Sequence, residues 1–223
     1  ADALNNRGER FDVVIANAGV MNCPFGLTED GFETQFGTNH IGHFLLINRL
    51  APLIADGGRV VILSSSAHRA SDVDLDDPGF AKSTYEGFAA YGRSKTANVL
   101  FAVELDRRLR GRGIRATALH PGGIRTELLR HTSAEMLAEM AARSGRTPNA
   151  GESTQVKTVE QGAATSVWAA FVASGDAVGG RFCEDCQVAE VMEQGAGVRP
   201  YAIDPERAKA LWALSEKMVD EQF

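Results

Sequence analysis

The sequence predicts an α/β protein built on a doubly wound parallel sheet. Three short apolar runs, at 12–16, 59–64 and 114–120, each stop abruptly at small or turn-forming residues. Longer segments with helical periodicity lie between and after these runs. Buried parallel strands are continuous apolar runs, and strands that alternate with helices build a sheet covered on both faces. We therefore expect this sheet to be the centre of the fold.

The composition is that of a single globular domain over residues 1–223. Hydrophobic residues make up 44% and charged residues 23%, and the net charge of −6 argues against nucleic-acid binding. No apolar run reaches the roughly 18 residues of a membrane span. The first residues also lack the apolar core of a signal peptide. Three cysteines are few and odd in number, which argues against a disulfide framework and favours a cytoplasmic protein.

Strands and helices are expected to alternate along the whole chain. In order, the pattern predicts a strand at 12–16, a helical segment from Thr28 to about Ile54, a strand at 59–64, a polar loop at 66–87, a helix at 88–110, a strand at 114–120, helices at 133–142 and 159–173, a short strand at 179–183 and a terminal helix at 204–219.

The elements of the first half rest on a few local signals. The apolar run Val13-Val14-Ile15 forms the body of the first strand. Thr28 fits a helix N-cap, and Glu29 and Asp30 follow it in the first turn, where carboxylates are favoured. We expect Gly57-Gly58 to break the helical segment before the second strand begins.

The elements of the second half follow from the same rules. Val99 and Val103 give the helix at 88–110 an apolar side. Gly111 and Gly113 are expected to end this helix, because glycine is common just past a helix C-terminus. Pro205 suits the first turn of the terminal helix, where its missing N–H is not needed.

The three strand ends carry polar and small residues. The first strand ends in Asn17-Ala18-Gly19, the second in Ser64-Ser65-Ser66 and the third in His120-Pro121-Gly122. Each stretch alone is an ordinary turn. In parallel sheets, however, ligands bind at the carboxyl ends of the strands. Their occurrence at three successive strand ends predicts a binding site along this edge.

The stretch Tyr91-Gly92-Arg93-Ser94-Lys95 lies on the helix between the second and third strands. A tyrosine and a lysine four residues apart share one helix face. The ammonium is expected to lower the pKa of the phenol from its usual value of about 10. Such a phenol can act as a general acid or base at a carbonyl or an alcohol. The same pair also occurs on solvated helices without any function.

Several motifs together resemble one enzyme family. The chain resembles the short-chain dehydrogenases/reductases, and most closely their retinol-dehydrogenase-like and WW-domain-oxidoreductase-like branch. The resemblance runs from residue 12 to the terminal helix and implies a Rossmann-type sheet. It rests on Asn17-Ala18-Gly19-Val20-Met21, Thr38-Asn39-His40-Ile41-Gly42-His43-Phe44, Ser64-Ser65-Ser66-Ala67-His68, Tyr91-Gly92-Arg93-Ser94-Lys95, His120-Pro121-Gly122-Gly123-Ile124-Arg125-Thr126, and Leu211-Trp212 with Ser215-Glu216.

The resemblance implies a catalytic role for four residues. Tyr91 would be the general acid/base at the substrate oxygen, and Lys95 would lower its pKa and hold the ribose hydroxyls of the cofactor. Ser65 would hydrogen-bond the substrate oxygen, because the family pattern places the serine three residues before the position of His68. Asn39 resembles the helix asparagine that supports a water-linked proton relay to the lysine.

The resemblance also implies a nicotinamide cofactor, NAD or NADP. The protein would supply position and electrostatics, while the cofactor carries the hydride. The residues expected to bind the cofactor are Asn17, Ala18, Gly19, Leu63, Tyr91, Lys95, Pro121, Gly122, Ile124 and Thr126.

The sequence departs from the family at its N-terminus. No glycine-rich dinucleotide-binding turn precedes residue 12, and about two βα units of the family pattern, roughly 30 residues each, have no counterpart. Preference for NAD or NADP is therefore unreadable. A sheet without its first strands would expose an apolar edge. We expect either that the sequence is an N-terminally incomplete part of a longer protein or that another surface fills this place, and we favour the first.

Two further patterns suggest metal or redox chemistry but do not require it. His40 and His43 are three residues apart on a helix, yet the family resemblance explains both without a metal. Cys183-Glu184-Asp185-Cys186 is a CxxC motif without a second ligand pair. We expect reduced structural thiols and no metal site.

The substrate and the partners are less well defined. In the family, the segment 126–158 forms a lid over the substrate, although an amphipathic helix with a loop fits the sequence equally well. Its apolar content hints at a lipophilic substrate. The family commonly dimerises through its long helices, so a homodimer is possible.

The sequence therefore predicts an NAD(P)-dependent oxidoreductase that interconverts an alcohol and a ketone or aldehyde, with tyrosine as general acid/base. The alternative is a non-catalytic interaction or scaffold domain that keeps the motifs without binding a dinucleotide. The set of Asn39, Ser65, Tyr91 and Lys95 supports the enzyme, and the missing glycine-rich turn supports the alternative.

Overall fold

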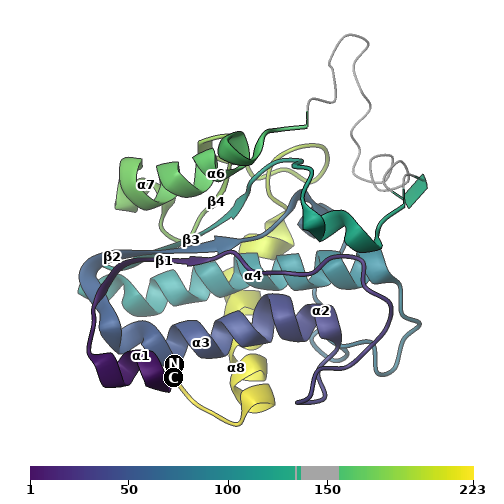
Figure 1. Ribbon diagram of the computed structural model, residues 1–223, viewed down its shortest axis with the longest axis horizontal. Coiled ribbons are helices and arrows are strands. Elements are labelled where there is room, and N and C mark those ends of the chain that lie inside the picture. Colours follow the sequence, from purple (N-terminus) through teal and green to yellow (C-terminus); the bar gives the residue numbers. More distant parts are fainter. Residues whose placement is uncertain (134, 137–155) are drawn as a thin grey trace.

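The computed structural model describes residues 1–133, 135–136 and 156–223, and a five-stranded sheet lies at its centre (Figure 1). The strand order β1-β2-β3-β4-β5 follows the chain. The first four strands are parallel, and β5 is antiparallel to β4. The strands are β1 Phe11–Ala16, β2 Ile54–Leu63, β3 Arg115–His120, β4 Phe182–Glu184 and β5 Gln187–Val188.

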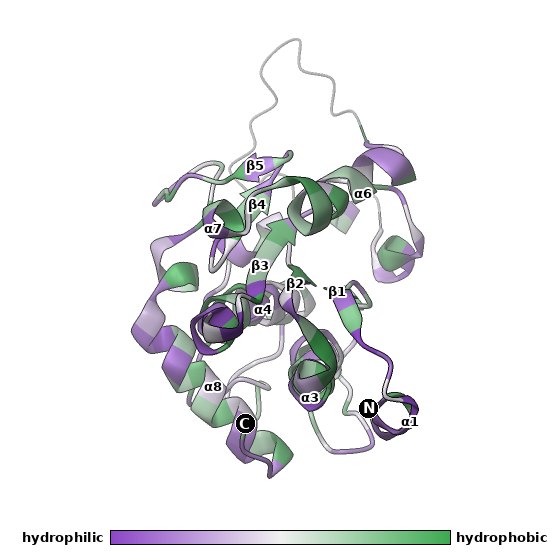
Figure 2. Ribbon diagram, turned by 90° about the vertical axis from the view of Figure 1, so that its left-hand side faces the viewer, coloured by the Kyte–Doolittle hydropathy of each residue, from purple (hydrophilic) through white to green (hydrophobic). Residues whose placement is uncertain are grey.

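Helices cover both faces of this sheet, as the sequence predicts. Figures 1 and 2 show α3, α4 and α8 on one face and α6 and α7 on the other. The helices are α1 Asp2–Arg7, α2 Thr34–Phe36, α3 Gly42–Leu50, α4 Gly87–Leu109, α6 Val159–Val167, α7 Gly175–Val178 and α8 Pro205–Val219, with π-helical η1 Gly37–Ile41 and η6 Trp168–Val172, and 3₁₀ turns η2 Ala51–Leu53, η3 Ser66–Arg69, η4 Arg110–Arg112, η5 Glu127–His131 and η7 Pro200–Ile203.

The face under α3, α4 and α8, the thick face, holds the larger core. Alternate side chains of each strand point to this face, which is the period-two pattern of a pleated sheet. Phe44 of α3, Phe101 of α4 and Trp212 of α8 pack together, with ring centroids 5.0–5.8 Å apart. All three side chains are at most 3% exposed. Aromatic side chains thus join three helices to one another and to the sheet.

The face under α6, η6 and α7, the thin face, has a smaller core. Val61, Leu119 and Cys183 of the sheet pack there against Ala169 and Ala170 of η6. Apart from Trp168, which is only partly buried, the helix residues that pack there are alanines and Val178, so less apolar area is buried than on the thick face. Four large apolar side chains near this face remain at least 40% exposed: Ile15, Val167, Phe171 and Val172.

Three details differ from the sequence-based expectations. Helix α2 begins after Glu33, whose carboxylate accepts the N–H groups of Gln35 and Phe36; Thr28 is not its N-cap. Gly57 does not break the chain before a new strand, because β2 already starts at Ile54 and the pairing with β1 shifts register instead. Strand β5 makes the sheet mixed rather than wholly parallel.

Most predicted elements are present. The predicted helix at 159–173 is α6 continued by the π-helix η6, and η3 opens the predicted loop at 66–87. The predicted helix at 133–142 falls almost entirely outside the described residues. Within the described part of the chain, no helix is both long and apolar enough to cross a membrane.

Candidate active site

Helix α4 carries the tyrosine–lysine pair and is the most deeply buried helix of the structure's described part. The carboxylate of Glu86 caps it by accepting the N–H groups of Phe88 and Ala89. Every residue from Ala90 to Ala102 is buried, because the helix lies between the sheet and its neighbouring helices. Side chains held on such an element keep fixed positions, which favours a preorganised site.

Tyr91 is 3% exposed and lies in an apolar setting. Burial raises its pKa to about 12, and a hydrogen bond with the side chain of Ser65 works against this rise. The expectation of a lowered Tyr91 pKa is therefore wrong, because the pKa is raised. The Lys95 Nζ atom lies 5.6 Å from the ring centroid, and desolvation outweighs its attraction.

Lys95 is 5% exposed, and its ammonium donates to the carbonyl of Leu63 at 3.1 Å. Burial lowers its pKa to about 8. An ammonium has three N–H donors. Only the bond to Leu63 is made with the described residues, so the other donors remain for a ligand or solvent.

Two of the serines at the end of β2, Ser64 and Ser65, make different hydrogen bonds. The hydroxyl of Ser64 is turned inward and donates to the carbonyl of Lys95 at 2.7 Å. Ser65 begins η3, and its hydroxyl accepts the N–H of Ala67 at 3.2 Å. Of the three serines at 64–66, only Ser65 has a side-chain hydrogen bond with the Tyr91 phenol. The geometry brings together the serine and the tyrosine that the sequence singled out, while their catalytic role stays a prediction.

Asn39 lies in the π-helix η1 and is fully buried. Its amide exchanges two hydrogen bonds with the backbone of Val20, at 2.8 and 2.9 Å, and donates to the hydroxyl of Ser94 at 2.9 Å. The side chain thus fastens the loop after β1 to helix α4. Because these bonds occupy the Asn39 side chain, only its main chain is left to support the predicted proton relay.

The residues expected to bind the cofactor lie along one edge of the sheet. Asn17 and Ala18 are exposed just after β1. A Cβ at Gly19 would lie 3.0 Å from Oδ1 of Asn39 and 3.6 Å from Nζ of Lys95. Glycine is therefore the residue that lets the backbone pass this close to the lysine. Leu63 ends β2 and is half-buried.

The segment after β3 adds the remaining predicted positions. Gly122 has a φ of +98°, and half-buried Pro121 precedes it. Ile124 packs on Gly162 of α6, whereas Thr126 is exposed and caps η5. Lys157 was not predicted from the sequence; its side chain lies against Gly122 and pairs with Asp185 at 2.5 Å. No local motif marks this lysine, because the strand-like bridge between residues 124 and 157 brings it there.

An apolar cluster surrounds Tyr91. Met21, Ala67 and Phe88 are buried against the phenol ring, and Leu128 and Leu129 of η5 pack on the same cluster. Met21 and Ala67 belong to the quoted motifs and the other three residues lie close to them in sequence, which is the signal that could have identified the cluster. The site therefore offers an apolar wall beside its polar groups.

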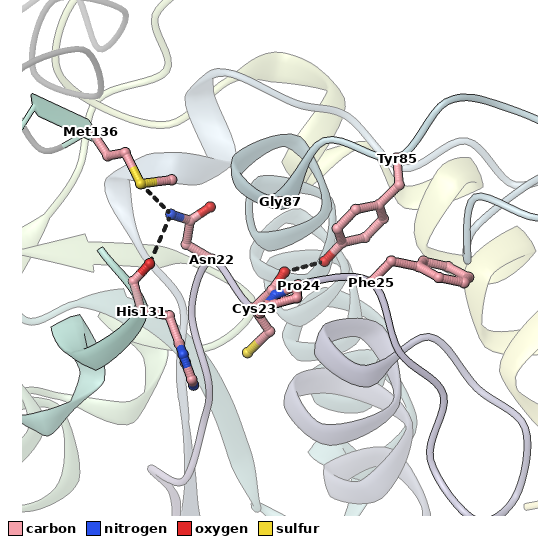
Figure 3. Close-up of a pocket in the computed structure, with 8 residues that line it drawn as sticks. All are labelled: Asn22, Cys23, Pro24, Phe25, Tyr85, Gly87, His131 and Met136. Atoms are coloured by element: carbon pink, nitrogen blue, oxygen red, sulfur yellow. Dashed lines mark hydrogen bonds between the residues drawn. The ribbon is translucent and has the colours of Figure 1, made fainter. Parts of the chain in front are cut away.

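A cavity of about 340 Å³ lies next to this cluster (Figure 3). Two of its lining residues are direct sequence neighbours of cluster members: Asn22 follows Met21, and Gly87 precedes Phe88. The Nδ2 atom of Asn22 reaches the carbonyl of His131 at 3.5 Å, and the hydroxyl of Tyr85 donates to the carbonyl of Cys23 at 2.8 Å. The lining residues are Asn22, Cys23, Pro24, Phe25, Tyr85, Gly87, His131 and Met136.

The two histidines of η1 and α3 point to different partners. Nε2 of His40 lies 2.9 Å from Oγ of Ser215, and Nδ1 of His43 lies 2.9 Å from the carbonyl oxygen of Asn39. The thiols of Cys183 and Cys186 are free. No group of three potential metal ligands occurs in the described ranges.

These observations define the class of the protein. A mostly parallel α/β sheet brings a Ser–Tyr–Lys set and glycine-containing turns to the carboxyl ends of its strands, as in Rossmann-type proteins with dinucleotide sites. A family model described as "short chain dehydrogenase" matches residues 1–137. The chain belongs to the short-chain dehydrogenase family.

Similar proteins support the same placement. Retinol dehydrogenase 14 of Homo sapiens is 40% identical over 212 residues, which cover 94% of this chain and 59% of that protein. A probable oxidoreductase of Streptomyces lividans is 43% identical over 209 residues, covering 91% of this chain and 70% of its own. These relatives agree with the predicted retinol-dehydrogenase-like branch. The chain spans about three fifths of the length of retinol dehydrogenase 14.

Solved structures show the same fold. A crystal structure of an uncharacterised protein from Mycobacterium paratuberculosis has a TM-score of 0.70 and 35% identity, covering all of this chain and 73% of that one. A short-chain dehydrogenase from Burkholderia cenocepacia, solved in complex with NADP, has a TM-score of 0.56 at 20% identity, covering 81% of this chain and 67% of that one. The second likeness concerns the fold alone.

Proposed function

We propose that this protein is an NAD(P)-dependent oxidoreductase that interconverts an alcohol and a ketone or aldehyde. The observation that carries the proposal is the meeting of three groups: the Tyr91 phenol, the Ser65 hydroxyl bonded to it and the buried ammonium of Lys95. They come from two different elements, η3 and α4. A phenol and a hydroxyl that lie this close together can both hydrogen-bond the same substrate oxygen.

Tyr91 would act as the proton donor in the reducing direction. Because its pKa is raised to about 12, it is a neutral phenol near pH 7. When a hydride reaches the carbonyl carbon, the oxygen takes the phenol proton and an alcohol forms. Lys95, with a pKa of about 8, remains largely protonated at neutral pH and would stabilise the phenolate that is left.

The residues present fit the nicotinamide half of a dinucleotide, which would supply or take up the hydride. Lys95 has N–H donors to spare, as a pair of ribose hydroxyls requires, and Gly19 keeps the approach to it open. The exposed Asn17 and Ala18 would line the same path. NADP in a dehydrogenase of the same fold supports a cofactor of this class, without choosing between NAD and NADP.

We propose a lipophilic substrate. The apolar wall of Met21, Ala67 and Phe88 beside the phenol would hold an apolar group next to the reacting carbon. The adjoining cavity would receive its more distant part (Figure 3). Pockets for small molecules are mostly apolar with few polar groups, as here. The name retinol dehydrogenase, carried by relatives about 40% identical, points in the same direction.

Cofactor titration tests the proposal first. NADPH and NADH are added to the folded chain and nicotinamide fluorescence is followed. Saturable binding, together with turnover of apolar ketones or alcohols, is expected. The matched variant Tyr91→Phe keeps the ring and removes the hydroxyl, and it should reduce turnover by about 100-fold or more while leaving cofactor binding intact.

Two outcomes would overturn parts of the proposal. Unchanged turnover in Tyr91→Phe would remove the acid/base role of the phenol. A folded chain without any cofactor binding would favour the alternative of an interaction domain for these 223 residues. The exposed edge and apolar side chains of the thin face are the surface such a domain would use.

A further inference from the structure

His68 has no assigned role, yet it touches the candidate catalytic serine directly. It is fully buried in η3, three residues after Ser65. Its Nδ1 atom lies 2.6 Å from the carbonyl oxygen of Ser65, and its own backbone N–H donates to that same oxygen at 3.2 Å. One residue therefore holds the Ser65 carbonyl from two directions.

The opposite side of the His68 ring is held by the C-terminal part of the chain. The backbone N–H of Arg199 donates to Nε2 at 3.4 Å. The hydroxyls of Tyr201 and Thr96 donate to the His68 carbonyl, at 2.5 and 3.2 Å. The ring also packs against Phe182 of β4 in a tilted arrangement, with centroids 4.6 Å apart. Three segments that are far from His68 in sequence thus converge on this residue: 199–201, Thr96 of α4 and Phe182 of β4.

These partners fix the tautomer of the ring. A backbone N–H can only donate, so Nε2 must present its lone pair to Arg199. A carbonyl oxygen can only accept, so Nδ1 must carry the proton toward Ser65. The ring is also kept neutral, because burial lowers the His68 pKa to about 4. Both ring nitrogens are therefore committed to structural partners, and neither is left for proton transfer.

We propose that His68 is a positioning residue for Ser65. Held in the Nδ1–H tautomer between the N–H of Arg199 and the carbonyl of Ser65, it fixes the backbone of Ser65 and so the placement of the hydroxyl opposite Tyr91. The proposal rests on the function given above, in which Ser65 contacts the substrate oxygen. It assigns the C-terminal segment at 199–201 a part in building the site.

Two substitutions separate positioning from simple packing. His68→Phe keeps a ring against Phe182 and removes both hydrogen bonds. His68→Asn is smaller but places an amide N–H where Nδ1–H was. Because small displacements of a catalytic group cost about 100-fold in rate, His68→Phe should lower kcat by about 10–100-fold, with KM and the cofactor dissociation constant changed less than about two-fold. His68→Asn should recover part of kcat although it packs less well.

Loss of kcat in His68→Asn but not in His68→Phe would overturn the proposal, since packing alone would then explain the effect. A comparison with Tyr91→Phe keeps the two proposals apart. If Tyr91→Phe loses turnover and His68→Phe does not, positioning by His68 is wrong and the proposed function stands. If Tyr91→Phe keeps full turnover, the proposed function is wrong.

A measurement on the unsubstituted chain needs neither activity nor a stable variant. Long-range ¹H–¹⁵N NMR of the imidazoles distinguishes a protonated ring nitrogen from one with a free lone pair. The expected result for His68 is a protonated Nδ1 and an unprotonated Nε2 that persists from pH 8 to about 5, given the pKa of about 4. A protonated Nε2, or an imidazolium at pH 6, would overturn the proposal.

Discussion

The two faces of the sheet differ in what they contribute. The thick face packs α3, α4 and α8 on the strands with large aromatic side chains. The thin face packs Ala169, Ala170 and the partly buried Trp168 of η6 and leaves Phe171 and Val172 about 70% exposed. The tyrosine, lysine and asparagine of the candidate site all stand on thick-face elements. The difference shows that the more densely packed side of the sheet also carries these three side chains.

The largest effect is expected from the centre of the thick face. Phe101→Ala removes a ring that touches Phe44, Trp212 and His40 and is only 2% exposed. Loss of a buried aromatic side chain should lower the free energy of unfolding by about 3–5 kcal/mol. Urea denaturation followed by circular dichroism measures it. A loss below about 1 kcal/mol would show that the thick face does not dominate stability.

An ion pair that links the two faces is the next target. Asp106 of α4 is fully buried and accepts from the guanidinium of Arg115 and from the backbone N–H of Ala116. The same guanidinium reaches Asp176 of α7 on the thin face. Asp106→Asn leaves the arginine without its buried partner, so we expect a loss of about 3 kcal/mol. If the double variant with Arg115→Met is no more stable than Asp106→Asn, the unpaired charge is not the cause.

Low pH should destabilise the fold through three histidines with lowered pKa values. Burial lowers the pKa of His40 to about 3, of His68 to about 4 and of His120 to about 3. The unfolded chain binds these protons near pH 6.5, whereas the folded chain does not, so stability falls as the pH drops from about 6.5 to about 4. Each histidine adds a slope of about 1.4 kcal/mol per pH unit. Denaturant midpoints measured between pH 7 and 4.5 test this; a flat profile would contradict it.

The smallest effect on stability belongs to the thin face. Phe171 is 69% exposed, so Phe171→Ser should change the free energy of unfolding by less than about 0.5 kcal/mol. It should also reduce self-association, because exposed apolar patches promote contacts between molecules. Chemical denaturation and light scattering measure the two effects. A loss of more than about 1 kcal/mol would mean that Phe171 is covered in solution, and the contrast between the faces would disappear.

The strands and the site edge were predictable because their signals are local. The continuous apolar run at 60–63 and the serines after it identify a buried parallel strand that ends at a site. The Tyr91–Lys95 spacing likewise fixes both side chains on one helix face. By contrast, Thr28 followed by Glu29 and Asp30 imitates an N-cap, and only the tertiary course of the chain selects Glu33. Local signals name candidates, and packing chooses between them.

The electrostatics of the site were not predictable from spacing. The sequence places an ammonium four residues from the phenol, which favours a lowered pKa for Tyr91. Its actual direction depends on how deeply the ring is buried, and burial raises it. Lys157 and the role of His68 were not predicted, for a related reason. Their partners, Asp185 and Arg199, are far away in sequence, so no motif joins them.

The order of synthesis determines when the contacts between His68 and the segment 199–201 can form. Synthesis proceeds from the N-terminus, so Asn39, Ser65, Tyr91 and Lys95 leave the ribosome well before Arg199 and Tyr201 do. The early strands can pair in turn, since the sheet order follows the chain. The contacts that hold His68 from the far side nevertheless form last. A chain interrupted before residue 199 would therefore carry every motif of the candidate site while leaving its serine unfastened.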